Sequence, residues 1–155
     1  MADEVRRDAP GGPSYALLVS AACEVREQSY SPYSGFRVGA ALLGADGRVY
    51  VGTNVENASF GLTLCAERNA VARAVADGET RFEAIAICAD GKPPTPPCGA
   101  CRQVLVEFGR DLTVLLAGER GAAGPVRRFR LSELLPEAFT AIPGCPRAPE
   151  GETDR

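Results

Sequence analysis

The sequence contains no histidine among its 155 residues. This absence excludes Ser-His and Cys-His nucleophilic schemes, and it excludes every metal site that depends on an imidazole ligand. If the protein performs chemistry near neutral pH, then cysteine, a carboxylate or a metal ion must carry that chemistry.

The sequence also lacks a large charge of one sign and a long apolar run. Its 17 basic and 20 acidic residues give a formal net charge of −3 at pH 7, and 45% of all residues are hydrophobic. A protein that binds nucleic acid or an anionic membrane needs a clustered basic face. We therefore expect one globular domain that has neither nucleic acid nor a membrane as a partner.

The N-terminal region loosely resembles an export signal. Arg6 and Arg7 precede an apolar patch at residues 16–23, but a Pro/Gly-rich stretch at residues 10–13 separates the two. The apolar residues of the patch recur at helical spacing, which favours an amphipathic helix. We expect a cytoplasmic protein.

Composition divides the chain into three parts. We expect a flexible leader at residues 1–13, a single domain at residues 14–142 and a disordered tail at residues 143–155. The patterns predict helices at 14–28 (capped by Ser14), 65–76, 98–108 and 131–135, and strands at 36–43, 48–54, 84–88, 112–116 and 126–130. Helices interleaved with strands predict an α/β sandwich with a mixed sheet.

Three cysteines and one carboxylate form the most informative pattern. Cys65 and Glu67 begin one predicted helix, and Cys98 and Cys101 begin another. A helix N-terminus stabilises thiolates, and three ligands with a vacant fourth position are typical of catalytic zinc. The pattern predicts a Zn²⁺ site with Glu67 as the adjacent proton carrier. Arg68 is a candidate to hydrogen-bond the thiolates, and a surface helix arginine is the alternative.

Other roles for the cysteines stay open at this point. Cys98 and Cys101 could form a redox dithiol, or Cys88 could be the fourth ligand of a structural zinc site. We expect instead that Cys88 is a buried small hydrophobe, that Cys23 belongs to a helix core and that Cys145 is an exposed thiol. The six cysteines could form a disulfide set, but a reduced chain fits their spacing better.

At these residues the sequence resembles the cytidine deaminase family. The segments Cys65-Ala66-Glu67 and Pro97-Cys98-Gly99-Ala100-Cys101 are similar to its zinc signature. Further similar segments lie at residues 31–42, 54–60, 101–104 and 134–139. The resemblance implies a homotetramer of three-layer α/β/α sandwiches with a mixed sheet of about five strands. It also implies one zinc ion per subunit and shared active sites.

The resemblance further implies which residues bind the substrate. Asn54 and Glu56 would bind the ribose hydroxyls, although ordinary turn chemistry is the alternative for this pair. Phe36 would pack against the pyrimidine, and the Ala66 backbone would help to hold the base.

Three more residues would act between subunits. Ala58 and Phe60 would come from a neighbouring chain, and Phe139 would cover a neighbouring site. Without the resemblance, Phe36 and Phe139 would be taken for core aromatics.

The implied reaction is the hydrolytic deamination of cytidine and 2′-deoxycytidine to uridine and 2′-deoxyuridine, with release of ammonia, in pyrimidine salvage. Zinc would activate the attacking water, and Glu67 would carry its proton to the base and then to the leaving group. Two alternatives remain. One is a deaminase of a related nucleoside such as blasticidin S or a modified nucleoside, and the other is a zinc-stabilised binding module without catalysis.

Overall fold

The computed structural model describes residues 15–142 and residue 144. The predicted leader, the cap Ser14 and Cys145 lie outside these residues, as does nearly all of the predicted tail. The division into leader, domain and tail therefore stays a prediction.

A mixed five-stranded sheet with the strand order β2-β1-β3-β4-β5 is the centre of the fold. Only β3 and β4 run parallel, and the other neighbouring strands are antiparallel. The strands are β1 (Val38–Gly44), β2 (Val49–Thr53), β3 (Phe82–Ala89), β4 (Thr113–Ala117) and β5 (Val126–Arg130). The α-helices are α1 (Tyr15–Arg26), α2 (Ala66–Ala76), α3 (Gly99–Val106) and α4 (Leu131–Leu134).

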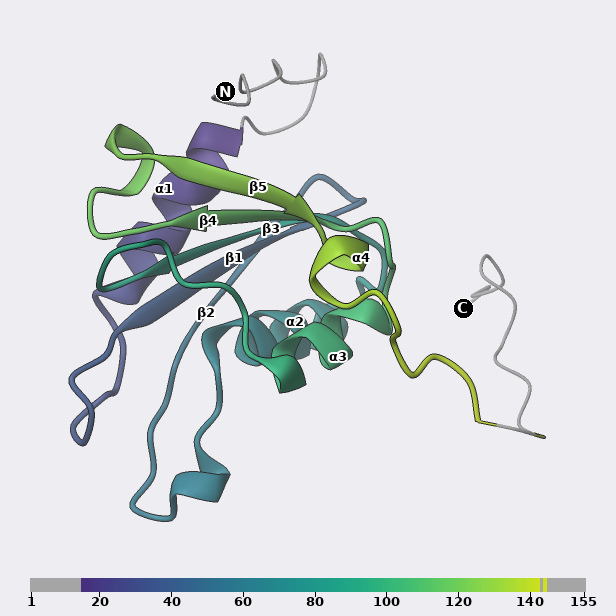
Figure 1. The fold of residues 1–155 in the computed structure, drawn as a ribbon, viewed down its shortest axis with the longest axis horizontal. Helices are drawn as coiled ribbons and strands as arrows, with labels where there is room; N and C mark the ends of the chain where they lie inside the picture. Colours follow the sequence, from purple (N-terminus) through teal and green to yellow (C-terminus); the bar gives the residue numbers. More distant parts are fainter. Residues whose placement is uncertain (1–14, 143, 145–155) are drawn as a thin grey trace.

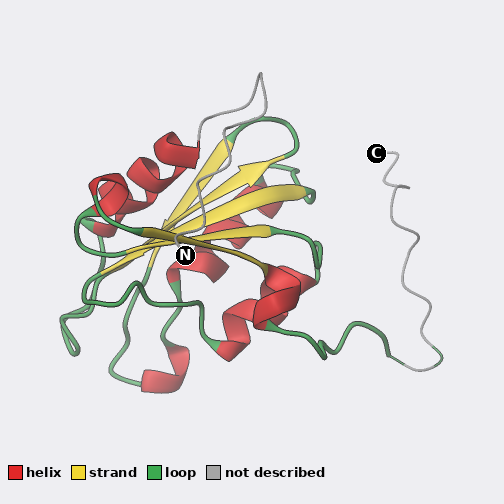
Figure 2. Ribbon diagram, turned by 45° about the horizontal axis from the view of Figure 1, so that its top comes forward, coloured by secondary structure: helices red, strands yellow, loops and turns green. Residues whose placement is uncertain are grey.

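Helices cover both faces of the sheet. Helix α1 lies on one face, and α2 and α3 lie on the other (Figure 1; Figure 2). Successive side chains of the inner strand β1 point to opposite faces of the sheet, because Ala41 packs toward α1 whereas Ala40 and Leu42 pack toward α2. The predicted α/β/α sandwich is confirmed. No helix in the described part of the chain is long and apolar enough to span a membrane.

One glycine on each face allows a helix to approach the sheet closely. A Cβ atom at Gly39 would lie 2.0 Å from the carbonyl oxygen of Ala22 in α1. A Cβ atom at Gly52 would lie 2.4 Å from the nitrogen of Ala70 and 2.5 Å from the oxygen of Ala66, both in α2. Any larger residue at either position would have to push a helix backbone away from the sheet.

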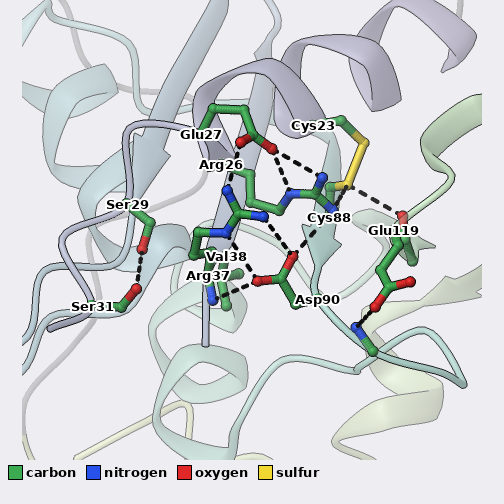
Figure 3. A network of polar contacts seen from close by, with 12 residues as sticks. Cys23, Arg26, Glu27, Ser29, Ser31, Arg37, Val38, Cys88, Asp90 and Glu119 are labelled. Atoms are coloured by element: carbon green, nitrogen blue, oxygen red, sulfur yellow. Dashed lines mark hydrogen bonds and ion pairs between the residues drawn. A yellow bond between two sulfur atoms is a disulfide. The ribbon is translucent and has the colours of Figure 1, made fainter. Parts of the chain in front are cut away.

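Cys23 and Cys88 form a disulfide between α1 and β3 (Figure 3). Their Cα atoms lie 5.1 Å apart, although 65 residues separate them in sequence. Cys88 is buried in the core and Cys23 packs against the same cluster, as expected, but the expectation of a reduced chain is wrong for this pair. The cause is the packing of α1 on β3, which brings the side chains together within disulfide range. Cys88 is thereby removed as a candidate fourth zinc ligand.

Two arginines and two carboxylates form a network beside the disulfide (Figure 3). Arg26 lies 3.1 Å from Glu27 and 3.6 Å from Asp90, and Arg37 lies 2.6 Å from Glu27 and 3.1 Å from Asp90. The network joins the end of α1, the residue before β1 and the residue after β3. Interactions that share partners in this way restrain all three segments together.

Candidate active site

The three predicted zinc ligands lie together at the N-termini of two helices. Cys65 is the N-cap of α2, Cys98 is the N-cap of α3, and Cys101 lies in the first turn of α3. Their sulfur atoms all lie within 4.8 Å of one another, and the Cys65 and Cys98 sulfurs are 3.9 Å apart. Two sulfurs bound to one tetrahedral zinc at about 2.3 Å each lie roughly 3.8 Å apart. The cluster therefore fits a zinc ion, and no fourth ligand joins it among residues 15–142.

The electrostatics of the cluster favour an anionic sulfur. A hydrogen bond with Cys101, aided by Arg68 and Cys98, lowers the pKa of Cys65 to about 5. The same hydrogen bond, together with burial, raises the pKa of Cys101. Cys65 is therefore the more acidic of these two thiols. A divalent cation would release the remaining thiol protons, because zinc binds thiolates.

Arg68 is directed toward this cluster. Its Nη2 donates to the carbonyl oxygen of Thr63 at 2.9 Å and lies 3.9 Å from the sulfur of Cys65. Its Nε is buried and has no hydrogen-bond partner among the described residues. A partly buried guanidinium with spare donor capacity offsets the negative charge that three thiolates bring. This position favours the hydrogen-bonding role over that of a surface arginine.

Glu67 is a buried carboxyl beside the cluster. It lies in the first turn of α2, and only 5% of its surface is exposed. Burial raises the pKa of the Glu67 carboxyl, and the negative charge of Cys65 adds to the rise. A carboxyl whose pKa is moved toward neutrality can both accept and donate a proton during a reaction.

A cavity of about 250 Å³ opens where β3 ends and β1 begins. Its lining residues come from five segments: Ser34, Phe36, Val38, Asn54, Glu56, Thr63, Cys65, Ala66, Glu67, Ile87, Ala89, Thr95, Pro96 and Cys98. The lining combines two cysteines of the cluster and Glu67 with four predicted substrate-binding residues. Cavities of this size hold small molecules, and this one combines apolar walls with a few polar groups.

Asn54 lies in the cavity wall, but most of its side chain is already engaged. Its Oδ1 accepts hydrogen bonds from the Val38 backbone nitrogen at 2.9 Å and from the Ser29 hydroxyl at 2.5 Å. Its Nδ2 donates one hydrogen to the carbonyl oxygen of Phe36 at 2.9 Å. An amide nitrogen carries a second hydrogen, and this is the group that Asn54 can offer to a ligand. The alternative of turn chemistry therefore describes part of its role.

Glu56 is held by the turn that precedes β1. Its Oε2 accepts from the backbone nitrogens of Tyr33 at 2.8 Å and Ser34 at 3.2 Å, and its Oε1 accepts from the Ser34 hydroxyl. The Ser34 side chain is the main cause, and these backbone donors a further cause, of the lowered pKa of the Glu56 carboxyl. Glu56 therefore presents a carboxylate to the cavity.

Ala58, Phe60 and Phe139 do not line this cavity in their own chain, although Phe60 lines a neighbouring hollow together with Ser34, Glu56 and Thr63. Ala58 and Phe60 belong to the loop between β2 and α2, which extends away from the sheet (Figure 1). Phe60 is 75% exposed and Phe139 is 65% exposed. Neither aromatic residue is part of the core. Without the family resemblance, Phe139 would have been taken for a core residue, and its exposure excludes that alternative.

Helix α3 and the turn after it hold the C-terminal segment, residues 134–139, through its backbone. Arg102, Gln103 and Arg110 each donate a side-chain hydrogen bond at 2.7 Å to a carbonyl oxygen of this segment. Arg102 also donates to the carbonyl oxygen of Pro97 at 2.8 Å. One side chain thus joins the turn before Cys98 to the C-terminal segment.

Sequence reasoning missed Ser34, Thr63 and Thr95 as lining residues of the cavity. Ser34 lies in a predicted turn, where serine is ordinary, so its type carried no functional signal. Thr63 and Thr95 lie in loops whose approach to the cavity depends on tertiary structure.

Comparison with known protein families also indicates a zinc-binding site in this chain. The sequence model described as the cytidine and deoxycytidylate deaminase zinc-binding region matches residues 14–117. This match defines the chain as a zinc-binding deaminase domain.

Comparison with individual proteins identifies the family within this class of deaminases. Cytidine deaminase from Halalkalibacterium halodurans is 50% identical over 125 residues, which cover 81% of this chain and 93% of the relative. Cytidine deaminase from Mycobacterium tuberculosis is 47% identical over 124 residues, with 79% and 87% covered. The crystal structure of cytidine deaminase from Burkholderia pseudomallei superposes with a TM-score of 0.77 at 47% identity and covers 81% of this chain and 99% of that one. The chain belongs to the cytidine deaminase family.

Proposed function

We propose that the protein is a zinc-dependent hydrolase that converts cytidine to uridine and releases ammonia. The observation that carries the proposal is the position of Glu67, a buried carboxyl in the same cavity as a three-cysteine cluster. A structural zinc site needs four protein ligands and no proton carrier. Glu67 therefore argues against the zinc-stabilised binding module.

Glu67 has the central chemical role in this proposal. Zinc, when bound, supplies a Lewis acid that activates water for attack on C4 of the cytosine ring. Glu67 accepts the proton that the water loses and passes it to N3, which makes C4 more electrophilic. The same carboxyl then carries a proton to the departing amino group. A raised pKa suits this exchange because a general acid–base works best near the ambient pH.

The other cavity residues hold the nucleoside. Phe36 packs against the ring, and the free N–H of Ala66 in the first turn of α2 is available to the base. Glu56 and the second hydrogen of Asn54 Nδ2 bind sugar hydroxyls. Cytidine and 2′-deoxycytidine differ by one hydroxyl, so we include both as substrates. The Glu56 carboxylate disfavours a phosphorylated sugar because like charges repel.

We further propose a homotetramer whose subunits complete one another's sites. The support is the exposure of Phe60 and Phe139, because large exposed apolar side chains mark interaction surfaces. Ala58 and Phe60 would reach a neighbouring cavity, and Phe139 would cover one. The proposed activity fits a cytoplasmic enzyme of pyrimidine salvage that binds one zinc ion per subunit.

The test is Glu67→Gln, which keeps the shape of the side chain but cannot carry the proton. We expect turnover of cytidine, followed by the ultraviolet change as cytosine becomes uracil, to fall at least about 100-fold. Zinc content per chain should stay unchanged. Glu83→Gln, at an exposed glutamate of β3, is the matched control and should behave as the wild type.

Two results would contradict the proposal. Near-normal turnover by Glu67→Gln would remove the proton carrier from the mechanism. A zinc-loaded wild-type protein that leaves cytidine unchanged, but deaminates blasticidin S or a modified nucleoside, would replace the substrate.

A further inference from the structure

The hydroxyl of Ser34 forms hydrogen bonds with two other residues that line the cavity. It donates a hydrogen bond to Oε1 of Glu56, and it accepts one from the backbone nitrogen of Phe36 at 3.0 Å. Ser34 itself lines the cavity. One small side chain thus contacts both the carboxylate at the sugar end and the residue that faces the base.

The surrounding turn explains why this hydroxyl is directed at the carboxylate. The turn is closed by a hydrogen bond from the Gly35 nitrogen to the Ser31 oxygen at 3.0 Å, and Gly35 has a φ of +69°. Successive backbone N–H groups in such a turn form a concave site for an anion. Here the N–H groups of Tyr33 and Ser34 face Glu56, and the Ser34 hydroxyl supplies a third donor.

Counting acceptor positions shows what the third donor does. A carboxylate offers about four acceptor positions, two on each oxygen. The backbone donors occupy both positions on Oε2, and Ser34 occupies one on Oε1. One position on Oε1 is left for a ligand, so the Ser34 hydroxyl determines which way the remaining lone pair points.

We propose that Ser34 is a positioning residue that orients Glu56 to accept a single sugar hydroxyl. This inference rests on the proposed function, since it assumes that Glu56 binds the sugar. Ser34 makes no contact with the reacting atoms in this scheme. Its effect should therefore appear in substrate binding and should depend on whether the sugar carries hydroxyl groups.

The experiment compares Ser34→Ala with the wild type on two nucleosides, cytidine and 2′,3′-dideoxycytidine, which lacks both hydroxyls that Glu56 could bind. For cytidine we expect KM to rise about tenfold with little change in kcat, because a charge-assisted hydrogen bond is misdirected. For dideoxycytidine we expect KM to stay within about twofold of the wild-type value, since the substrate has no hydroxyl for Glu56. Ser34→Thr keeps the hydroxyl and should restore the cytidine KM.

Two further variants separate positioning from a general effect on the turn. Ser31→Ala removes the other hydroxyl of the same turn, which contacts Ser29 and through it Asn54 rather than Glu56, so its effect on the cytidine KM should be smaller than that of Ser34→Ala. In a Glu56→Gln background, Ser34→Ala should add little, because both substitutions act through one interaction.

Each outcome decides between the proposals. A Ser34→Ala variant that loses the same factor on both nucleosides, or that loses nothing on cytidine, would overturn the role of Ser34 while cytidine deamination stands. Full additivity with Glu56→Gln would do the same. A wild-type protein that fails to deaminate cytidine would instead overturn the proposed function and this inference with it.

Discussion

The two faces of the sheet hold cysteines in opposite arrangements. On the α1 face, Cys23 and Cys88 are bonded to each other inside the layer between helix and sheet. On the α2 and α3 face, Cys65, Cys98 and Cys101 are free, although their sulfurs lie within 4.8 Å of one another. Both groups lie near an arginine, so a neighbouring positive charge does not distinguish them.

Position in the secondary structure does distinguish them. Cys65 and Cys98 cap helices and line a cavity, where N–H groups and a metal ion can stabilise thiolates. Cys23 lies within helix α1 and Cys88 within strand β3, so neither residue caps an α-helix. The same residue type therefore supports metal chemistry on one face and a covalent link on the other.

The largest expected difference concerns zinc. Cys98→Ser should remove zinc and lower turnover more than about 100-fold, because even partners outside the ligand set cost 10–100-fold in metal affinity. The double variant Cys23→Ser/Cys88→Ser should keep one zinc per chain and turnover within about twofold of the wild type. Zinc content by atomic absorption and the deamination rate are the measurements. Loss of zinc in the double variant would show that the two cysteine groups are not separate.

The next effect concerns stability. The disulfide closes a loop of 65 residues, and chain entropy then predicts that its loss lowers the free energy of unfolding by about 4 kcal/mol. Urea unfolding of oxidised protein and of the Cys23→Ser/Cys88→Ser variant, both loaded with zinc, measures this difference. If thiol titration of oxidised, zinc-loaded protein finds Cys23 and Cys88 free, the covalent link on the α1 face does not exist.

The smallest effect uses the two glycines that face the helices. Gly39→Ala and Gly52→Ala should each lower the free energy of unfolding by about 3 kcal/mol, because the new methyl group overlaps a helix backbone. Only Gly52→Ala displaces the first turn of α2, which follows Cys65, so only this variant should release zinc to a chelator faster, by about tenfold. Equal zinc release from both variants would mean that strain passes through the sheet.

Most of the fold could be predicted from the sequence because its signals are local. The helix predicted at 65–76 is α2 (Ala66–Ala76), and the strand predicted at 48–54 is β2 (Val49–Thr53). The strand predicted from residue 36 begins at Val38, since pairing with β2 and β3 starts near that residue. Boundaries depend on such pairing, which periodicity does not report.

The residues of the site also separate into those that local spacing predicts and those whose contacts depend on the assembled fold. The cysteine cluster and Glu67 follow from short spacings at two helix starts, which a sequence displays directly. The engagement of Asn54 by Ser29 and Val38, and of Glu56 by Ser34, depends on contacts between residues 16 to 25 positions apart. The disulfide depends on a contact across 65 positions. Such distant pairs exist only once the layers have assembled.

The anchoring of the C-terminal segment has a consequence for how this region can change. Arg102, Gln103 and Arg110 grasp only carbonyl oxygens, a group that every amino acid possesses. Leu134, Leu135 and Ala138 also pack against the core, but Phe139 is mostly exposed, so the route of the chain at position 139 does not depend on that side chain. The side chain at position 139 can therefore change while the hydrogen bonds that hold the backbone of this segment stay the same.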